Sequence, residues 1–409
     1  MNKKLKIAFL VSRFPSVSET FIVNQICDLI DRGHEVKIFA FEKDENSIRH
    51  EKIQAYQLEK HAFYFEKILI PKRRRYLPFI KYIVRNFGKE SLHSIFKDFE
   101  FQMKGFKALN LNFFYRYFWI LKHGYFDIIH SHFGENGIYF ANLRRTGFYS
   151  RSKFVATFHG YDIQPLLLER YQKKYQKIFR TADLLTVNSI FSKNLLKGIT
   201  DRNITILPVG LDTRFFRKKN VRKNSIFQIT YVGRLVEFKG AHIAIKIIAE
   251  LKDRGFEDIN LNIVGEGETK PKLKKMISEL DLRSNIKFYG VLSQMETRDL
   301  LDRTDVFILP GIIDQHGRAE NQGLVIQEAQ AMQVPVLVSD AGGMKYGLQD
   351  EISGYVLEIG DIEAFANKIE FLIINDKEKI KMGMAGREFV KKKFDSKYLG
   401  DQLLEIYHR

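Results

Sequence analysis

The sequence contains a single cysteine, Cys27, among 409 residues. One cysteine excludes a disulfide within the chain and is typical of a protein from a reducing compartment. No apolar run approaches the length that a membrane-spanning helix needs, roughly 20 residues. The stretch 113–121 comes nearest, but it is short and contains Arg116. The charged start lacks the small-residue cleavage site of a secretory signal. These absences predict a cytoplasmic protein without a membrane span.

Two kinds of binding site are also missing from the sequence. Cysteine and histidine do not cluster at the spacings that hold zinc. There is no helix-turn-helix, RNA-recognition or zinc-finger pattern. We therefore expect no nucleic-acid partner, although the basic composition described next would suit one.

Acidic residues are scarce in the first half of the chain. Residues 1–205 carry 35 Lys and Arg against 19 Asp and Glu, whereas residues 206–409 carry 31 against 30. The amino half should therefore meet an anionic partner. Segment 71–123 has four basic residues at 72–75 and continues with aromatic residues at roughly helical spacing, which suits a helix on an anionic membrane surface. An ordinary amphipathic helix packed on a sheet explains this segment equally well.

The apolar runs predict an α/β protein of two domains, because one core seldom holds so long a chain. Short strands alternate with helices in both halves, which favours doubly wound parallel sheets. The expected strands are 5–11, 36–41, 126–130, 153–157, 184–187 and 204–207, then 226–232, 260–264, 286–289, 306–309, 336–339 and 355–357. The expected helices include 19–32 with Ser18 as its N-cap, 241–254, 270–280, 324–332 and 398–407.

The domain boundary is expected near 208–212. This places an amino-terminal domain at 1–207, a carboxyl-terminal domain at 208–394, and a terminal helix within 395–409 that packs back on the first domain. Ligands of such folds bind at the carboxyl ends of the strands, so a cleft between the two domains should hold the site.

Two glutamates eight positions apart, Glu320 and Glu328, are the most informative feature of the sequence. Gly323 lies between them, before an apolar run, which predicts a loop that enters a helix. The start of a helix offers unpaired N–H groups and the positive end of the helix dipole, and it therefore binds phosphate. One carboxylate could lie on each side of that phosphate and accept hydrogen bonds from hydroxyl groups. Alone, such a pair is more often two solvated helix charges.

Two cations add to this pattern. Arg234 and Lys239 flank a glycine turn that follows the β-branched run 229–232. Arginine offers a planar fork to phosphate oxygens and lysine offers a point charge. One such cation is usually surface charge, but two of them in the same half as a phosphate-ready helix favour a diphosphate site.

Taken together, these motifs resemble the retaining glycosyltransferases of family 4, also called group 1, which have the GT-B fold. The resemblance covers nearly the whole chain and rests on 229–240, 260–268 and 320–343, the last of which includes the pair Gly342-Gly343. In the amino half, 14–21, 130–133 and 157–162 look like the subgroup of colanic-acid and other exopolysaccharide transferases. The resemblance implies two Rossmann-like domains that face a deep cleft, with the acceptor on the first domain and a nucleotide-sugar on the second.

The resemblance also implies roles for residues of the second domain. Arg234 and Lys239 would bind the donor diphosphate and neutralise the charge that grows on it. Glu328 would hold the ribose hydroxyls, and Glu320 those of the donor sugar. The remaining donor contacts would come from the backbone N–H groups of Leu324 and Val325, opened by Gly323, and from the backbone of Val291 next to the base.

In the first domain, the resemblance assigns His159 to the donor sugar or the leaving phosphate. His159, Glu320, Arg234 and Lys239 are thus the expected catalytic residues. The weaker expectations on the acceptor side are Ser16, Ser18, His130, His132 and Asp162.

The sequence departs from the family pattern at two places. Many relatives carry a glycine pair in the first loop, whereas this loop, 12–18, has none. Arg13, Ser16 or Ser18 would have to replace the missing backbone contact to the diphosphate. In the glutamate motif, Asn321 and Gln322 precede Gly323, so the donor-sugar contact can differ and the sugar cannot be carried over from relatives.

No metal or other cofactor is expected. The chain has no Asp-x-Asp, the pair that generally holds Mg²⁺ or Mn²⁺ on the diphosphate in metal-dependent glycosyltransferases. The helix dipole, Arg234 and Lys239 would take the place of the metal.

The sequence therefore predicts a retaining hexosyltransferase. Its donor would be a UDP-sugar first and a GDP-sugar second, and its acceptor a lipid-linked saccharide or polysaccharide at the inner face of a bacterial membrane. Two other functions remain open. One is a sugar-nucleotide epimerase, or a transferase for a soluble metabolite, with the same fold. The other is a protein that binds an anionic polymer and retains only a vestigial nucleotide site.

Overall fold

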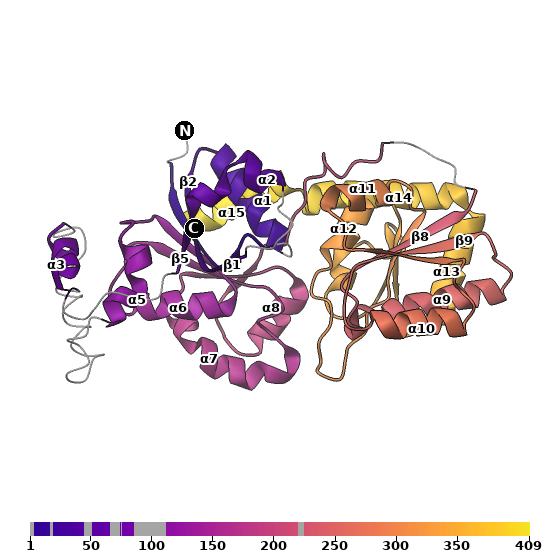
Figure 1. The fold of residues 1–409 in the computed structure, drawn as a ribbon, viewed down its shortest axis with the longest axis horizontal. Helices are drawn as coiled ribbons and strands as arrows, with labels where there is room; N and C mark the ends of the chain where they lie inside the picture. Colours follow the sequence, from indigo (N-terminus) through magenta and orange to yellow (C-terminus); the bar gives the residue numbers. More distant parts are fainter. Residues whose placement is uncertain are drawn as a thin grey trace.

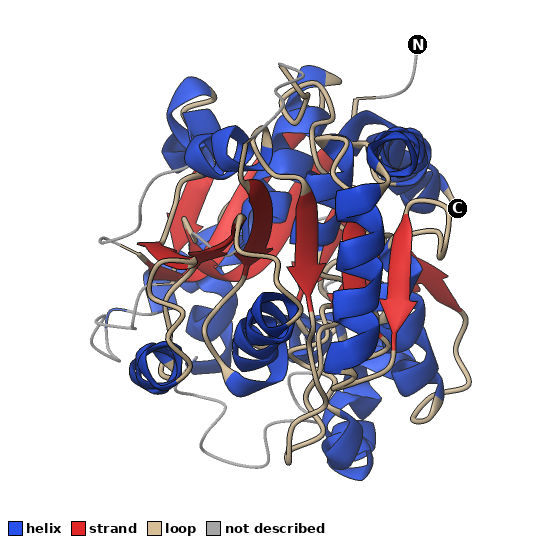
Figure 2. Ribbon diagram, turned by 90° about the vertical axis from the view of Figure 1, so that its right-hand side faces the viewer, coloured by secondary structure: helices blue, strands red, loops and turns tan. Residues whose placement is uncertain are grey.

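A computed structural model describes residues 4–16, 19–44, 51–65, 74, 76–85, 112–219 and 225–409. The described chain forms two parallel sheets, one in each half (Figure 1). The first has seven strands in the order β3-β2-β1-β4-β5-β6-β7, and the second has six in the order β10-β9-β8-β11-β12-β13. Helices cover both faces of the strands (Figure 2). The predicted α/β class with two doubly wound sheets is confirmed.

The first half follows the expected alternation of strands and helices. Its strands are β1 (Lys6–Phe14), β2 (Glu35–Lys43), β3 (Ala62–Tyr64), β4 (Ile128–His132), β5 (Lys153–Phe158), β6 (Leu184–Val187) and β7 (Ile204–Ile206). Its helices are α1 (Thr20–Asp31), α2 (Glu51–Ala55), α3 (Tyr76–Arg85), α5 (Asn112–Leu121), α6 (Gly134–Arg144), α7 (Leu168–Thr181) and α8 (Ile190–Lys197). Strand β3 was not expected, because three half-buried residues carry too short a pattern. The predicted cap, Ser18, lies outside the described residues.

The second half agrees more closely with the sequence pattern. Its strands are β8 (Phe227–Val232), β9 (Ile259–Val264), β10 (Ile286–Gly290), β11 (Val306–Leu309), β12 (Val336–Ser339) and β13 (Gly354–Leu357). Its helices are α9 (Ala241–Asp253), α10 (Lys270–Glu279), α11 (Gln294–Leu301), α12 (Leu324–Ala331), α13 (Ile362–Ile374) and α14 (Asp376–Lys393). Strands β11 and β12 are buried along their whole length, as parallel strands covered on both faces must be.

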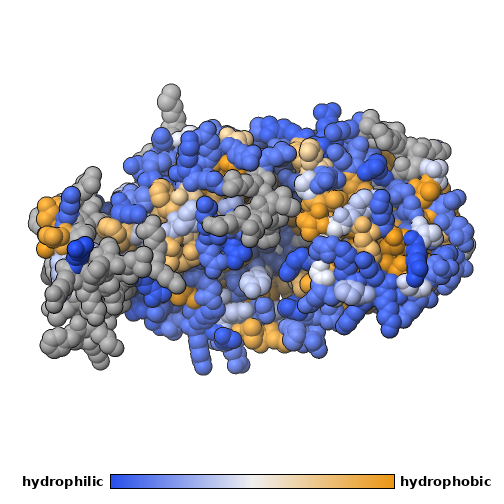
Figure 3. All heavy atoms as spheres, in the orientation of Figure 1, coloured by the Kyte–Doolittle hydropathy of each residue, from blue (hydrophilic) through white to orange (hydrophobic). Residues whose placement is uncertain are grey.

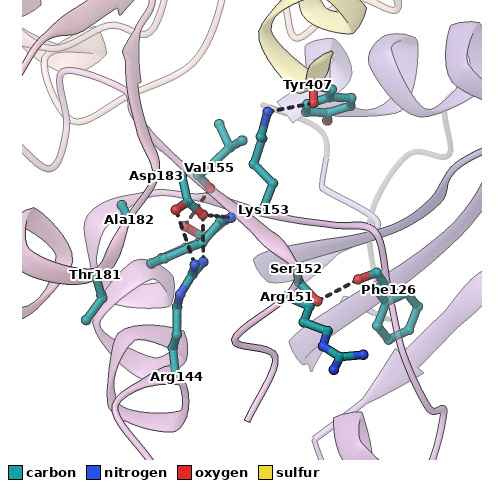
Figure 4. Close-up of polar contacts among 12 residues, drawn as sticks. Phe126, Arg144, Arg151, Ser152, Lys153, Val155, Thr181, Ala182, Asp183 and Tyr407 are labelled. Atoms are coloured by element: carbon teal, nitrogen blue, oxygen red, sulfur yellow. Dashed lines mark hydrogen bonds and ion pairs between the residues drawn. The ribbon is translucent and has the colours of Figure 1, made fainter. Parts of the chain in front are cut away.

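The last helix, α15 (Ser396–His408), returns to the first domain. It packs beside α1, so the yellow end of the chain lies among its indigo beginning in Figure 1. Leu399, Leu403 and Tyr407 share a core with residues of β1 and α1. At the far end of the helix, the Lys153 ammonium donates to the Tyr407 carbonyl over 3.0 Å (Figure 4). The chain therefore crosses between the domains twice.

Most of the surface on the face shown in Figure 3 is hydrophilic, and apolar residues there form small separate groups. Helix α3 stands apart from the sheet in Figure 1 and exposes apolar side chains, including Leu77 at 78% and Val84 at 68%. None of the helices in the described ranges is both long and apolar enough to cross a membrane.

Candidate active site

Two cavities lie between the domains at the carboxyl ends of the sheets. The central cavity, of about 380 Å³, is lined by residues of both halves, among them Phe21, His159, Arg234, Lys239, Glu320, Gly323 and Leu324. The outer cavity, of about 350 Å³, is lined by Asn24, Lys52, Val291, Ser293, Gln294 and Glu328, among others. Thr20, the first residue of α1, lines both cavities, so they adjoin there. Most of the residues predicted for the donor site thus line two adjoining cavities.

The cations of the central cavity follow strand β8. After Val232 the chain turns at Gly233, and a short 3₁₀ turn ends at Lys239 before helix α9. Gly240 has φ of 77°, and an added Cβ would lie 1.8 Å from the carbonyl oxygen of Pro310. Only glycine fits there, and this close approach directs Lys239 into the cavity beside Arg234.

Lys239 and Glu320 form an ion pair on the carboxyl-terminal side of the central cavity. Both side chains are nearly buried, at 15% and 14% exposure. Burial, together with the nearby charge of Arg234, lowers the pKa of Lys239 to about 7. Glu320 also accepts a hydrogen bond from the N–H of Asn321 at 3.0 Å. The site thus holds its cation next to a carboxylate, and an incoming anion would compete for that cation.

The loop that carries Glu320 rests on the glycine pair. The Gly343 N–H donates to the carbonyl of Glu320 at 2.8 Å. A Cβ on Gly342 would lie 2.2 Å from that same carbonyl oxygen, so the loop can approach only because the residue is glycine. Gly323, with φ of 70°, then opens helix α12, and its neighbour Leu324 also lines the cavity. The first N–H groups of α12 are therefore available to an anion.

Glu328 lies one turn into α12 and faces the outer cavity. It is 8% exposed, and burial raises its pKa to about 8. A hydrogen bond with Gln294 lowers this pKa, but by less than burial raises it. A carboxyl group at such a site gains most from hydroxyl donors, because they supply the hydrogen bonds that burial removed. Val291, predicted near the base, is 55% exposed at the rim of this cavity.

On the opposite wall, His159 follows strand β5 and is enclosed by rings. The ring centroids of Phe21 and Phe133 lie 4.8 and 4.9 Å from that of His159, and His132 stacks on it at 5.2 Å. Burial lowers the pKa of His159 to about 3, so its imidazole is neutral at physiological pH. It can donate or accept one hydrogen bond but brings no charge.

The two histidines predicted on the acceptor side, His130 and His132, are both buried. His130 is fully buried, and its two ring nitrogens bond to the hydroxyls of Tyr407 at 2.7 Å and Thr157 at 2.6 Å. From its place within β4 it faces the core and lines neither cavity, so the structure gives no support to an acceptor contact, which stays a prediction. His132 is equally buried, with its Nδ1 3.0 Å from Nε2 of His159, so it supports His159 rather than lining the cavity.

The other two described acceptor-side candidates differ in their surroundings. Asp162 is buried, and its carboxylate accepts from the N–H groups of His159 at 2.8 Å and Gly134 at 2.5 Å. It fixes the loop that holds His159. Ser16 lies at a separate hollow beside the first loop, and Ser18 is outside the described residues.

Of the two residues that depart from the family pattern in the glutamate motif, Asn321 contacts the first domain and Gln322 contacts the boundary segment. The Asn321 amide oxygen accepts from the hydroxyls of Ser189 at 3.0 Å and Ser192 at 2.7 Å, and its NH₂ group donates to Asn188. The Gln322 amide bonds both the N–H and the carbonyl of Val209, each at 2.8 Å. No sequence signal marked these contacts, because their partners lie more than a hundred residues away.

The arrangement favours one kind of ligand. Two cations and the start of a helix surround a space that suits a diphosphate, while carboxylates beyond it suit hydroxyl groups. Among the residues that the structure describes, no group of three or more His, Cys, Asp and Glu side chains could hold a metal ion.

Comparisons with known proteins agree with this chemistry. A family model for glycosyltransferase family 4 matches residues 18–215, and a model for glycosyl transferases group 1 matches residues 212–389. The chain is 29% identical to a putative colanic acid biosynthesis glycosyltransferase of Salmonella typhimurium, over 98% of this chain and 99% of that one. It is 28% identical to the amylovoran biosynthesis glycosyltransferase of Erwinia amylovora, over 99% and 100%.

Solved structures share the fold. The Anabaena protein Alr3699/HepE in complex with UDP superposes with a TM-score of 0.68 at 18% identity, over 98% of this chain and 99% of that one. The structure of TarM gives 0.69 at 14% identity, over 100% and 99%. Both are similar to this chain along its whole length, and they show the fold alone.

Proposed function

Because the chain belongs to the glycosyltransferases of family 4, group 1, we propose that it transfers a hexose from a nucleotide diphosphate sugar to a saccharide acceptor, with retention of the anomeric configuration. One observation supports this more than any other. Arg234, Lys239 and the start of α12 line one side of the central cavity, with His159 on the other. Glu328 lies in the adjoining outer cavity, where a ribose would follow the diphosphate.

In this proposal the diphosphate lies between the start of α12 and the two cations. As the sugar–phosphate bond breaks, negative charge grows on the diphosphate, and preorganised positive groups in a partly buried cavity lower the barrier. Lys239 would leave its pairing with Glu320 to bind the phosphate, and an adjacent anion would raise its pKa above 7 and keep it protonated. Glu320 would then accept hydrogen bonds from the donor sugar.

The acceptor hydroxyl must lose a proton as the new bond forms. His159 is neutral and enclosed by rings, and it would orient the sugar or the leaving phosphate. Glu320, which pairs with Lys239 in the empty site, would be occupied by the hydroxyls of the donor sugar once Lys239 has moved to the phosphate. The departing diphosphate, on the same face of the sugar as the incoming hydroxyl, would therefore take the proton, which is consistent with retention.

We further propose that the reaction needs no metal. Lys239, Arg234 and the α12 N–H groups supply the positive charge that a metal provides in other transferases. UDP is the first candidate nucleotide and GDP the second. A relative in Corynebacterium glutamicum is described as GDP-mannose-dependent, whereas the Anabaena structure contains UDP.

The proposed acceptor is a lipid-linked saccharide or polysaccharide of bacterial exopolysaccharide synthesis, reached at the inner face of the membrane. Colanic acid and amylovoran, for which the two full-length relatives are named, are the models for this step. On α3 the exposed Leu77, Ile80 and Val84 recur at helical spacing, with Lys81 exposed beside them. Such a helix suits an anionic lipid surface, and co-sedimentation with anionic but not neutral liposomes at low salt would test it.

The first experiment is a calorimetric titration with UDP, GDP and ADP in the presence of EDTA. We expect one of them to bind saturably without metal. Glu328→Ala should weaken that nucleotide by about 10- to 100-fold, because it removes hydrogen bonds to two ribose hydroxyls that contribute roughly 0.5–1.5 kcal/mol each. Glu279→Ala, which removes an exposed carboxylate from α10, is the matched control.

Three results would contradict the proposal. Failure of all three nucleotides to bind would contradict the assignment of the donor site. Unchanged nucleotide affinity in Glu328→Ala would contradict the assignment of the ribose contact to Glu328. Conversion of a nucleotide-sugar into its epimer, without acceptor, would identify an epimerase instead.

A further inference from the structure

The central cavity contains a third cation, Arg318, which the proposed donor site does not use. Arg318 lies in the loop between β11 and α12, two residues before Glu320. It lines the central cavity together with Arg234 and Lys239, but it does not line the outer cavity. Its side chain is 43% exposed, whereas that of Lys239 is 15% exposed. Arg318 therefore lies nearer to the open rim of the cavity than Lys239 does.

Asp314 fixes one edge of the Arg318 guanidinium. Nε of Arg318 donates to the Asp314 carboxylate at 2.7 Å. The same carboxylate accepts from the backbone N–H groups of His316 and Arg318, each at 2.9 Å, and its side chain is completely buried. These bonds within one loop leave the guanidinium little freedom to turn.

An aromatic ring adds to this support. Cζ of Arg318 lies 5.6 Å from the centroid of the Phe238 ring, which is within the range of a cation–π contact. Nζ of Lys239 lies 5.9 Å from the same centroid. Both cations are thus neighbours of one ring, and a substrate whose diphosphate binds Lys239 would have its sugar beside the part of the cavity that Arg318 lines.

The end of the guanidinium is left for a ligand. Asp314 takes only Nε, and neither terminal nitrogen of Arg318 makes a hydrogen bond with any residue that the structure describes. The two parallel N–H groups at the end of the fork match the two oxygens of a carboxylate, and such bidentate pairs are stronger than single neutral hydrogen bonds. A carboxylate on the substrate is therefore the group that this end suits.

The diphosphate is the other anion of the proposed reaction, but Arg318 lies in a different part of the cavity. The loop of Arg318 meets the first domain at its neighbour Gly317, where an added Cβ would lie 3.0 Å from Cγ of Leu166. Leu166 belongs to the 3₁₀ turn Pro165–Leu167 and is itself 68% exposed. Arg318 is thus at the mouth between the domains, whereas the phosphate-binding start of α12 is behind it.

We propose that Arg318 binds the carboxylate of an acidic hexose, so that a uronic acid forms part of the donor or of the acceptor. This rests on the proposed function, because it names the chemistry of a substrate of that same reaction. Arg318 is then a specificity residue: it contacts the sugar away from the bond that breaks, and it distinguishes an acidic sugar from a neutral sugar of the same shape.

The test has a donor arm and an acceptor arm, both on the full chain at low salt. In the donor arm, calorimetry compares UDP, UDP-glucose and UDP-glucuronic acid, or GDP, GDP-mannose and GDP-mannuronic acid if the protein binds GDP. In the acceptor arm, saturation-transfer NMR compares methyl glucuronide with methyl glucoside, and methyl galacturonide with methyl galactoside, on the protein saturated with nucleotide. In one arm we expect the acidic sugar to bind about 10-fold or more tightly, because the bond is charge-assisted.

Three variants show whether Arg318 causes this preference. Arg318→Gln removes the charge and should abolish the preference for the acidic sugar. Arg318→Lys keeps the charge but not the fork, so it should retain only part of the preference. Arg283→Gln, which changes an exposed arginine in the turn before β10, is the matched control and should have no effect. All three should bind the nucleotide alone as the wild type does, which also shows that the fold is intact.

Three results would overturn the inference. The first is a wild type without a preference for the acidic sugar in either arm, and the second is a preference that survives in Arg318→Gln. The third is weaker binding of the nucleotide alone in Arg318→Gln but not in Arg283→Gln, which would assign Arg318 to the diphosphate. None of these results contradicts the proposed function as long as the nucleotide titration succeeds. If no nucleotide binds while the glucuronide depends on Arg318, the cavity is an acidic-sugar site and the proposed transfer reaction is wrong.

Discussion

The two walls of the central cavity handle charge in opposite ways. The carboxyl-terminal wall contains Lys239 paired with Glu320, and Arg234 beside them. The amino-terminal wall contains a neutral His159 among aromatic rings. Yet the amino half carries the large excess of basic residues, and the carboxyl half is almost balanced. The half with the least net charge thus supplies the charged groups of the site.

The excess of net charge therefore lies in the amino half, whereas the charged groups of the site lie in the carboxyl half. The basic excess of the amino half includes exposed residues such as Lys173 of α7 and Lys81 of α3, outside the cleft. Those residues act at long range on an anionic surface and are screened by salt. In the carboxyl half, the nearly buried Lys239 acts at short range, where screening is weak.

The largest effect should come from removing a cation of the charged wall. Lys239→Met should lower kcat by about 10²–10³-fold, the usual cost of losing one preorganised group that stabilises transition-state charge. Steady-state kinetics with the identified donor would measure it. Lys246→Met, on an exposed face of α9, is the matched control.

Because Lys239→Met also leaves Glu320 buried without its cation, the double variant with Glu320→Gln must be compared with Glu320→Gln alone. A loss below 10-fold in that comparison would mean that the wall acts through its backbone and Arg234, and the contrast between the walls would weaken.

A change in the neutral wall should have a smaller effect and a different pH signature. His159→Asn keeps a hydrogen-bonding group and should reduce kcat by about 10-fold or more, since one positioned polar group is changed. The pKa of His159 is already lowered to about 3 by burial, so its protonation does not change between pH 5 and 8. The kcat–pH profile over that range should keep its shape in the variant. A wild-type limb near pH 6.5 that the variant loses would show that His159 titrates and that this wall is charged during the reaction.

Breaking the contact between the two walls should have a still smaller effect on the reaction. Asn321→Ala removes the bonds to Asn188, Ser189 and Ser192 that connect the donor loop to the first domain. We expect the donor KM to rise by about 10-fold, because water replaces part of what the three lost hydrogen bonds contribute. Small-angle scattering should show a larger radius of gyration without nucleotide. Asn203→Ala, in the exposed loop before β7, should change neither, and equal behaviour of the two variants would exclude a role for the bridge.

The two walls also differ in how far the sequence could predict them. Arg234, Lys239, Glu320 and Glu328 each follow a strand or open a helix, and a local motif places such residues without knowledge of the whole fold. The structure brings them to two adjoining cavities. The alternation of apolar runs likewise predicted both sheets, and missed only the short β3 among the strands described.

Residues of the neutral wall depend on packing that no local pattern contains. His130 and His132 occur in one tetrapeptide, 130–133, yet both are directed into the core. The bond from His130 to Tyr407 joins positions 277 residues apart. The bridging role of Asn321 depends in the same way on neighbours that only the folded chain supplies. The sign of a side chain's charge follows from the residue type, whereas its burial depends on the whole fold.

The smallest predicted effect concerns the stability cost of burying Glu328 in the outer cavity, on the same domain as the charged wall. Burial raises its pKa to about 8 in the folded protein, whereas an unfolded glutamate titrates near 4.3. The folded state therefore binds more protons than the unfolded state between these values, and stability falls as pH rises through that window. Glu328→Gln cannot ionise, so it should melt at about the same temperature as the wild type at pH 4 and on the order of 2–4 °C higher at pH 8. Thermal melts without nucleotide across this range would measure the difference. The opposite trend would show that the carboxylate is stabilised in the empty site, and that this wall is balanced before the donor arrives.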